Sequence, residues 1–260
     1  MHNAETSHEH KPNLLQGVNV FIVLAVLTAI EFFIAITNAS LLLISIVAIL
    51  KAALVMYYYM HVYKLADVDK HLDDPHSYEH KLISNRFGLW LFILSDAFLF
   101  AGLLTARFNL AGLTRLDLDQ ELGLIVTAVL LLSSFFMNRA ETQMKLGNNK
   151  GFVVNTALTA LLGIGFVVGV VAVEWPDAAS HGITASANAS SAIFYMMTGM
   201  HAFHVITGII FLLIVLRNGM KGLYTPEKHW AVEAATVYWH FVDLVWIFFY
   251  PALYLIGRLA

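Results

Sequence analysis

The sequence contains seven apolar runs of 18 to 27 residues, each long enough to cross a bilayer as a helix. None shows the alternation, about ten residues long, of a barrel strand. In hydrocarbon a helix satisfies all of its backbone groups within its own segment. The pattern therefore predicts an all-α, polytopic membrane protein with seven transmembrane helices. The predicted spans are 17–37, 40–63, 84–106, 121–138, 152–175, 190–216 and 232–257.

A polar stretch interrupts this pattern once, between the second and third spans. Residues 66–83 contain five acids, three histidines and a proline, a composition typical of a solvated connection. We expect this linker to separate an N-terminal two-helix hairpin, residues 1–65, from a five-helix bundle, residues 84–260, and to bind no metal. No internal repeat is visible, so the sequence does not support an inverted-repeat transporter.

Composition agrees with a membrane protein and excludes several other classes. Apolar residues make up 59% of the 260 residues and charged residues 13%, about half the charged share of a soluble domain. The net charge of −3 and the lack of a basic stretch argue against nucleic acid as a partner. The absence of cysteine excludes disulfides, thiolate metal sites and a Cys-bridged copper centre.

The distribution of Lys and Arg predicts the orientation. The N-terminal tail and the loops after spans two, four and six carry eleven basic residues, whereas the opposite side carries three and Lys51 lies within a span. By the positive-inside rule the N-terminus is cytoplasmic and the C-terminus lies outside. The first sixteen residues lack the basic start of a signal peptide, so we expect the first span to be retained.

Two opposite charges occur in the hairpin, Glu31 in the first span and Lys51 in the second. Counted at 1.5 Å per residue from opposite membrane faces, their Cα atoms lie within about 7 Å in depth. We expect an intramembrane ion pair that fixes the hairpin, with a role in a proton path as the alternative.

Five ionisable residues in the last two spans are expected to face one another. His201 and His204 share one face of span six, and Glu233, His240 and Asp243 lie within about 80° on span seven. Such groups are costly in a membrane and need a partner or a role. They form either a cluster that holds a lipid headgroup or relays protons, or simple interhelical contacts.

A single carboxyl group lies near the middle of span three. Asp96 is about 15 Å from the nearer end of that span and stands in the aromatic-rich segment Ser95–Phe100, which reads SDAFLF. It is the best single candidate for a proton-handling group. The alternative is a protonated Asp that only bonds to a neighbouring helix.

Three segments resemble a known family. Glu233–Trp246 reads EAATVYWHFVDLVW and closely resembles the final helix of subunit III of the haem-copper oxidases. Gly199–Gly208, GMHAFHVITG, resembles the family's preceding helix, and Ser95–Phe100 its Ser-Glu segment. The motifs occur in the family's order and cover about residues 78–260, the length of the five-helix bacterial form.

The hairpin has a resemblance of its own. Lys51–His61, KAALVMYYYMH, is similar to the second helix of the small bacterial subunit IV. This favours a fusion of subunit IV to subunit III. Seven spans with a cytoplasmic N-terminus are also the topology of the longer subunit III.

The resemblance implies a non-catalytic subunit of a cytochrome c oxidase in a bacterial inner membrane. Haem and copper would lie in partner subunits I and II, and this chain would hold no cofactor or metal and have no oxidase activity alone. It would bind phospholipid in a cleft, support proton uptake and prolong activity, and a respiratory supercomplex is a further expected partner.

The resemblance also implies roles for single residues. Asp96 would replace the family's buried Glu, whose side chain is one methylene longer. His204, Glu233 and His240 would surround the lipid cleft. The alternatives are a third subunit of a quinol oxidase or nitric oxide reductase, and an independent proton channel or transporter.

Overall fold

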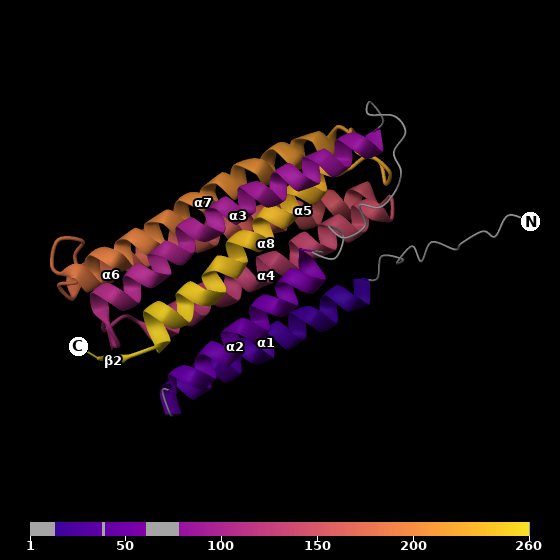
Figure 1. The fold of residues 1–260 in the computed structure, drawn as a ribbon. Helices are drawn as coiled ribbons and strands as arrows, with labels where there is room; N and C mark the ends of the chain where they lie inside the picture. The colour runs from indigo at the N-terminus through magenta and orange to yellow at the C-terminus, as the bar shows by residue number, and fades with distance from the viewer. Residues whose placement is uncertain (1–13, 38–39, 61–77, 260) are drawn as a thin grey trace, which may run out of the picture.

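The computed structural model describes residues 14–37, 40–60 and 78–259. In these ranges seven helices are long and apolar enough to cross a membrane, which confirms the predicted all-α fold and the number of spans. They lie side by side along one axis (Figure 1). The seven spans are Leu14–Thr37, Leu41–Tyr59, Lys81–Ala111, Gln120–Lys145, Asn149–Ser180, Ala189–Met220 and Trp230–Leu255.

Several helices continue past the apolar runs that predicted them. Helix α3 is Tyr78–Ala111 and α4 is Gln120–Lys145, so α3 begins inside the predicted linker 66–83, whose residues 66–77 lie outside the described ranges. Apolar character marks the hydrocarbon layer, whereas a helix stops where its backbone groups find other partners. At the start of α4, for example, the side chain of Asp119 accepts hydrogen bonds from the backbone N–H groups of Glu121 and Leu122, as an N-cap does.

Three described spans change from α-helix to π-helix near one end. Helix α2, Leu41–Leu54, continues as η1, Val55–Tyr59. Helix α5, Asn149–Val168, continues as η3, Gly169–Glu174, and then α6, Trp175–Ser180. The last span, α8, Trp230–Tyr250, continues as η4, Pro251–Leu255. Single π-helical turns are rare and frequently lie at functional sites.

Helix α8 is the central element of the bundle. In its most apolar window 78% of residues are buried, compared with 44% in α4 and in α7, Ala189–Met220. It packs against α3, α4 and α7, and Figure 1 shows it among these helices. The most conspicuous sequence motif therefore lies on the helix that contacts the most neighbours.

Two glycines let other helices approach the large ring of Trp239 on α8. A Cβ atom at Gly163 on α5 would lie 2.5 Å from Trp239 Cη2, and one at Gly208 on α7 would lie 2.9 Å from Trp239 Cε3. Both distances are shorter than side chains tolerate. Small residues allow close helix packing in membranes, and here they make room for a buried indole.

The hairpin of α1, Leu14–Thr37, and α2 packs on one side of the bundle, against α4, α8 and η4 (Figure 1). On η1 the Tyr59 hydroxyl donates to the backbone carbonyl of Gly17 at 3.2 Å. The Tyr59 ring also lies 4.8 Å from the ring of His240 on α8. The first contact closes the hairpin on itself, and the second joins it to the bundle. The division of the hairpin from the bundle as a separate domain stays a prediction.

One short parallel pair of strands lies at the end of the bundle that carries α6 and the C-terminus, which we call the C-terminal end (Figure 1). Strand β1, Thr114–Arg115, pairs with β2, Arg258–Leu259. Arg107 donates to the carbonyls of Gly112 and Thr114 at 3.2 and 2.7 Å. These contacts connect the α3–α4 loop to the end of the chain.

Candidate functional site

Asp96 on α3 lies beside His204 on α7. The distance from Asp96 Oδ2 to His204 Nε2 is 3.5 Å, and the two side chains are 16% and 10% exposed. The other ring nitrogen, Nδ1, donates to the backbone carbonyl of Met200 at 2.8 Å. Because a carbonyl oxygen only accepts, Nδ1 carries a hydrogen, and Nε2 is the ring nitrogen that faces Asp96 Oδ2.

The ring of Phe100 covers the Asp96–His204 pair on one side. Its centroid lies 4.7 Å from that of His204, with the two planes at 65°. Counted along the helices, Asp96 is about 22 Å from Lys81 and His204 about 24 Å from Met220. The pair therefore lies well inside the helical bundle but keeps some exposed surface.

Glu233, in the first turn of α8, forms an ion pair with Arg86 on α3. Arg86 Nε and Nη2 donate to the two carboxylate oxygens, each at 3.0 Å. The side chains are 27% and 13% exposed. This bidentate contact is the strongest geometry available to an Arg and a carboxylate.

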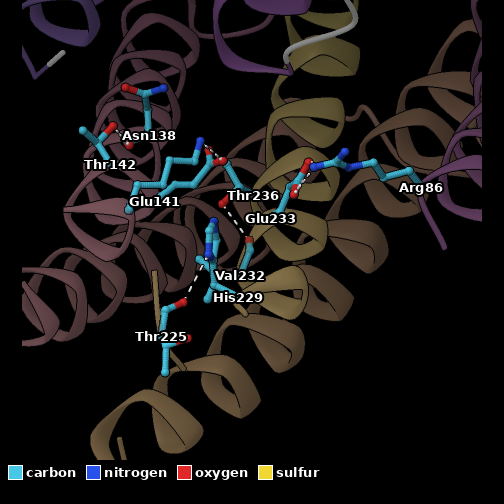
Figure 2. Close-up of polar contacts among 10 residues, drawn as sticks. Arg86, Asn138, Glu141, Thr142, Thr225, His229, Val232, Glu233 and Thr236 are labelled. Atoms are coloured by element: carbon cyan, nitrogen blue, oxygen red, sulfur yellow. Dashed lines mark hydrogen bonds and ion pairs between the residues drawn. The ribbon is translucent and has the colours of Figure 1, made fainter. Parts of the chain in front are cut away.

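A second acidic residue lies near this end of α8, on the α4 side. Figure 2 shows Glu141 and Arg86 on opposite sides of Glu233. Glu141 is buried and forms an ion pair with Lys145, one helical turn further along α4. The start of α8 therefore forms one ion pair with α3 and lies near a second ion pair within α4.

His240 and Asp243 lie where α8 meets α4. His240 Nδ1 is 2.6 Å from the hydroxyl of Ser134 and 3.8 Å from Asp243 Oδ2. Both side chains are buried, and neither Asp243 oxygen nor His240 Nε2 has a hydrogen-bond partner in the described part of the chain. These two residues thus form a local pair on one helix.

His201 is fully buried among aromatic rings. It stacks on Trp246 with centroids 4.9 Å apart, and Phe166 approaches it edge-on at 5.4 Å. Neither of its ring nitrogens finds a hydrogen-bond partner in the residues described. Its described neighbours are aromatic rings, and its role in a lipid-binding or interhelical cluster stays a prediction.

Glu31 and Lys51 meet as the depth arithmetic predicts. Lys51 Nζ donates to Glu31 Oε2, and both side chains are buried. The pair crosses from α1 to α2. Its role beyond that contact stays a prediction.

The structure thus divides the five residues expected to meet on spans six and seven into separate contacts. His204 lies beside Asp96, Glu233 beside Arg86, and His240 beside Ser134 and Asp243. Within the described ranges, no three His, Asp or Glu side chains gather as metal ligands would. Partners on two neighbouring helices, α3 and α4, rather than one shared face, determine these contacts.

Sequence reasoning missed the hydroxyl groups of α4. Ser133 Oγ accepts from Trp239 Nε1 at 3.0 Å, and Thr127 Oγ1 accepts from Trp246 Nε1 at 2.9 Å. The two tryptophans are seven residues apart and the hydroxyl residues six apart, about two helical turns in each case. This similar spacing was the one feature of the sequence that could have predicted the two indole–hydroxyl contacts.

Comparison with known proteins places these features in a family. The family "Cytochrome c oxidase subunit III" matches residues 11–258, which include the hairpin. The subunit 3 of cytochrome c oxidase from Papio hamadryas is 35% identical over 187 residues, 66% of this chain and 69% of the relative. The subunit 3 from Gallus gallus is 36% identical over 183 residues, 65% of this chain and 68% of the relative. The chain belongs to the cytochrome c oxidase subunit III family and is a multi-pass membrane subunit of a haem-copper oxidase that associates with other oxidase subunits.

Proposed function

We propose that this chain is a non-catalytic subunit that supports proton uptake through the Asp96–His204 pair and binds phospholipid near Arg86. Haem and copper then lie in partner subunits I and II, and this chain contributes no cofactor or metal ligand. The observation that carries the proposal is the contact between Asp96 Oδ2 and His204 Nε2 at 3.5 Å.

The pair has the chemistry of a proton-holding group. With Nδ1 engaged by the Met200 carbonyl, the proton lies on Nε2 as part of an ion pair, or on Asp96 facing a neutral ring. The two arrangements differ by the transfer of one proton over a short distance, without movement of a helix. A group that releases and regains protons in this way sustains uptake by a neighbouring subunit.

The Asp96→Asn variant tests this role. Asn keeps the shape of Asp but binds no exchangeable acid proton, so the purified oxidase should assemble normally while its initial proton uptake or its number of turnovers before inactivation falls. The matched control is Glu227→Gln in an exposed loop. Normal uptake and normal turnover lifetime in Asp96→Asn would show that Asp96 is only structural.

The lipid-binding part of the proposal rests on Arg86. A guanidinium group has five N–H donors, and the Glu233 contacts engage two of its nitrogens. The remaining donors and the 27% exposure of the side chain let Arg86 contact a phosphate group at the membrane surface while Glu233 fixes its orientation.

Loss of bound lipid tests this second role. Arg86→Lys and Glu233→Gln should lower the phospholipid that remains with the purified oxidase, while initial turnover is unchanged. His204→Ala is the comparison, because it lies deeper and belongs to the proton-handling pair. Equal phospholipid content in Arg86→Lys and the wild type would rule out the Arg86 site.

We also propose a compartment, an electron donor and a further partner for this chain. We infer a bacterial inner membrane, with the N-terminus cytoplasmic and the C-terminus outside, from the distribution of Lys and Arg. We infer cytochrome c as electron donor and a respiratory supercomplex as a further partner. The family match over residues 11–258 favours the seven-helix subunit III for the hairpin, and its origin as a subunit IV fusion stays a hypothesis.

Two other assignments make different predictions. A quinol oxidase or nitric oxide reductase would co-purify without a copper-binding subunit that carries Cys ligands. An independent proton channel or transporter would conduct when the chain is reconstituted alone in liposomes. We expect no flux under that condition, and haem a bands in the preparation from native membranes.

A further inference from the structure

Glu174 and Tyr254 form a buried polar contact that the proposed function does not use. Glu174 ends η3, Tyr254 lies on η4, and both are at most 2% exposed. The Tyr254 hydroxyl donates to Glu174 Oε1. Oε2 is also buried and has no hydrogen-bond partner among the residues that the structure describes.

Both partners lie on π-helical turns of different spans. A π-helical turn widens the helix and changes the direction of the side chains that follow. Gly123 on α4 makes room for the pair, since a Cβ atom there would lie 2.7 Å from Tyr254 Cδ1. Arg115 Nη1 and Gln120 Nε2 donate to the backbone carbonyl of Tyr254 at 2.5 and 3.2 Å. Three independent local features therefore hold the Tyr254 hydroxyl against Glu174.

The charged and titratable groups around Glu174 are acids and tyrosines. Asp119 and Asp177 lie within electrostatic range of its carboxyl group, as does Tyr195 on α7. The ring of Tyr250 lies 5.5 Å from that of Tyr254. No Lys, Arg or His in the described ranges forms an ion pair with Glu174. Arg115 contacts the pair only through the Tyr254 carbonyl and not through the carboxyl group.

A carboxylate in these surroundings would be a buried charge without a cation, which is strongly unfavourable. The protonated acid avoids this cost, because Oε1 accepts from Tyr254 and Oε2 carries the hydrogen. Glu174 is about 9 Å from Ser180, the last residue of its span. The exposed carboxyl groups of Asp119 and Asp177 lie on this side. They offer a path for protons between the aqueous phase and the buried acid.

We propose that Glu174, held by Tyr254, is a proton-binding site at the C-terminal end of the bundle that exchanges its proton with the aqueous phase on that side. In the exchange, an O–H bond forms at Oε2 as hydronium or a neighbouring protonated carboxyl gives up its proton, and the reverse step returns it. This site is separate from the Asp96–His204 pair and lies on different helices, so it stands whether or not that pair supports proton uptake.

Infrared difference spectroscopy of the purified oxidase tests the proposal. The wild-type spectrum minus that of Glu174→Gln should contain a carboxylic-acid C=O band, which moves to lower frequency in D2O. Gln can still accept from Tyr254, so the variant keeps the contact while losing the acid. A difference limited to ionised-carboxylate bands would overturn the protonated state. A C=O band that stays unchanged in D2O would overturn the exchange with water.

Two further variants test the assignment of the band to Glu174 even if Glu174→Gln fails to fold. Tyr254→Phe removes only the hydroxyl, so the Glu174 band should remain and move to higher frequency as its hydrogen bond is lost. Glu227→Gln, in the exposed loop before α8, should leave the band in place. A band that is unaffected by Tyr254→Phe, or lost in Glu227→Gln, would show that Glu174 is not the acid observed.

Discussion

Trp239 Nε1 donates to Ser133 Oγ at 3.0 Å, and both residues are buried. We predict that Ser133→Ala leaves the indole N–H without its partner and lowers stability by about 1–3 kcal/mol. Thermal unfolding of the purified protein in detergent measures the effect. Thr105→Ala is the control, because this exposed hydroxyl bonds only within its own helix, to Ala101 O. Equal unfolding temperatures in the two variants would contradict the prediction.

Removing one partner of the Glu31–Lys51 pair should lower stability more than replacing both partners. Either Glu31→Gln or Lys51→Met leaves one buried charge, with an expected loss of about 3–5 kcal/mol. The double variant removes both charges and should recover most of that loss. The amount of folded protein that survives a heating series measures all three variants. A double variant as unstable as the worse single variant would mean that the residues act through separate contacts.

Gly163→Ala should destabilise the bundle, because the new Cβ would lie 2.5 Å from the Trp239 ring. Overpacking of this kind costs about 1–3 kcal/mol. Gly102→Ala on α3 is the matched control, since a Cβ atom there would meet no atom of another helix within 4 Å. It should be neutral or slightly stabilising, because Ala favours helix more than Gly. In the same unfolding assay, Gly163→Ala should therefore lower the unfolding temperature, whereas Gly102→Ala should leave it unchanged or raise it slightly.

Asp96→Glu restores the residue type that the family resemblance implies at this position. The carboxyl group remains, one methylene further from the backbone, and His204 offers its Nε2 nearby. We expect proton uptake close to that of the wild type and clearly above that of Asp96→Asn. Stopped-flow uptake measurements on the purified oxidase decide the question. Identical losses in the two variants would show that the position of the carboxyl group matters as much as its acidity.

The seven spans and the Glu31–Lys51 contact could be predicted because both depend on position along one or two adjacent helices. Apolar length gives each span, and a short connection between α1 and α2 relates the depth of Glu31 to that of Lys51. The extra turns of α3 and α4 beyond their apolar runs could not be read in the same way. Hydropathy reports the hydrocarbon layer and says little about polar helix ends.

The contacts between helices that are far apart in the sequence were harder to predict. The sequence identifies Asp96 and His204 as unusual, but their meeting depends on α3 packing against α7. Arg86, at the start of the predicted span 84–106, was counted with the basic residues of the preceding loop, and its contact with Glu233 depends on how α3 packs against α8. The angular positions of Glu233 and His240 around α8 follow from the sequence. They do not indicate that α3 contacts Glu233 and α4 contacts His240.

The hydroxyl groups of α4 have a consequence for how the chain enters the bilayer. Helix α8 follows α4 in the chain, so α4 emerges from the ribosome before Trp239 and Trp246 are available. Ser133 and Thr127 meanwhile donate to carbonyls of their own helix, Leu130 and Gly123, each at 2.7 Å. Their oxygen lone pairs stay free to accept the two indole N–H groups afterwards. Both hydroxyl donors of α4 are therefore satisfied before α8 arrives, and the two indole N–H groups can bind the hydroxyl oxygens without breaking either of these hydrogen bonds.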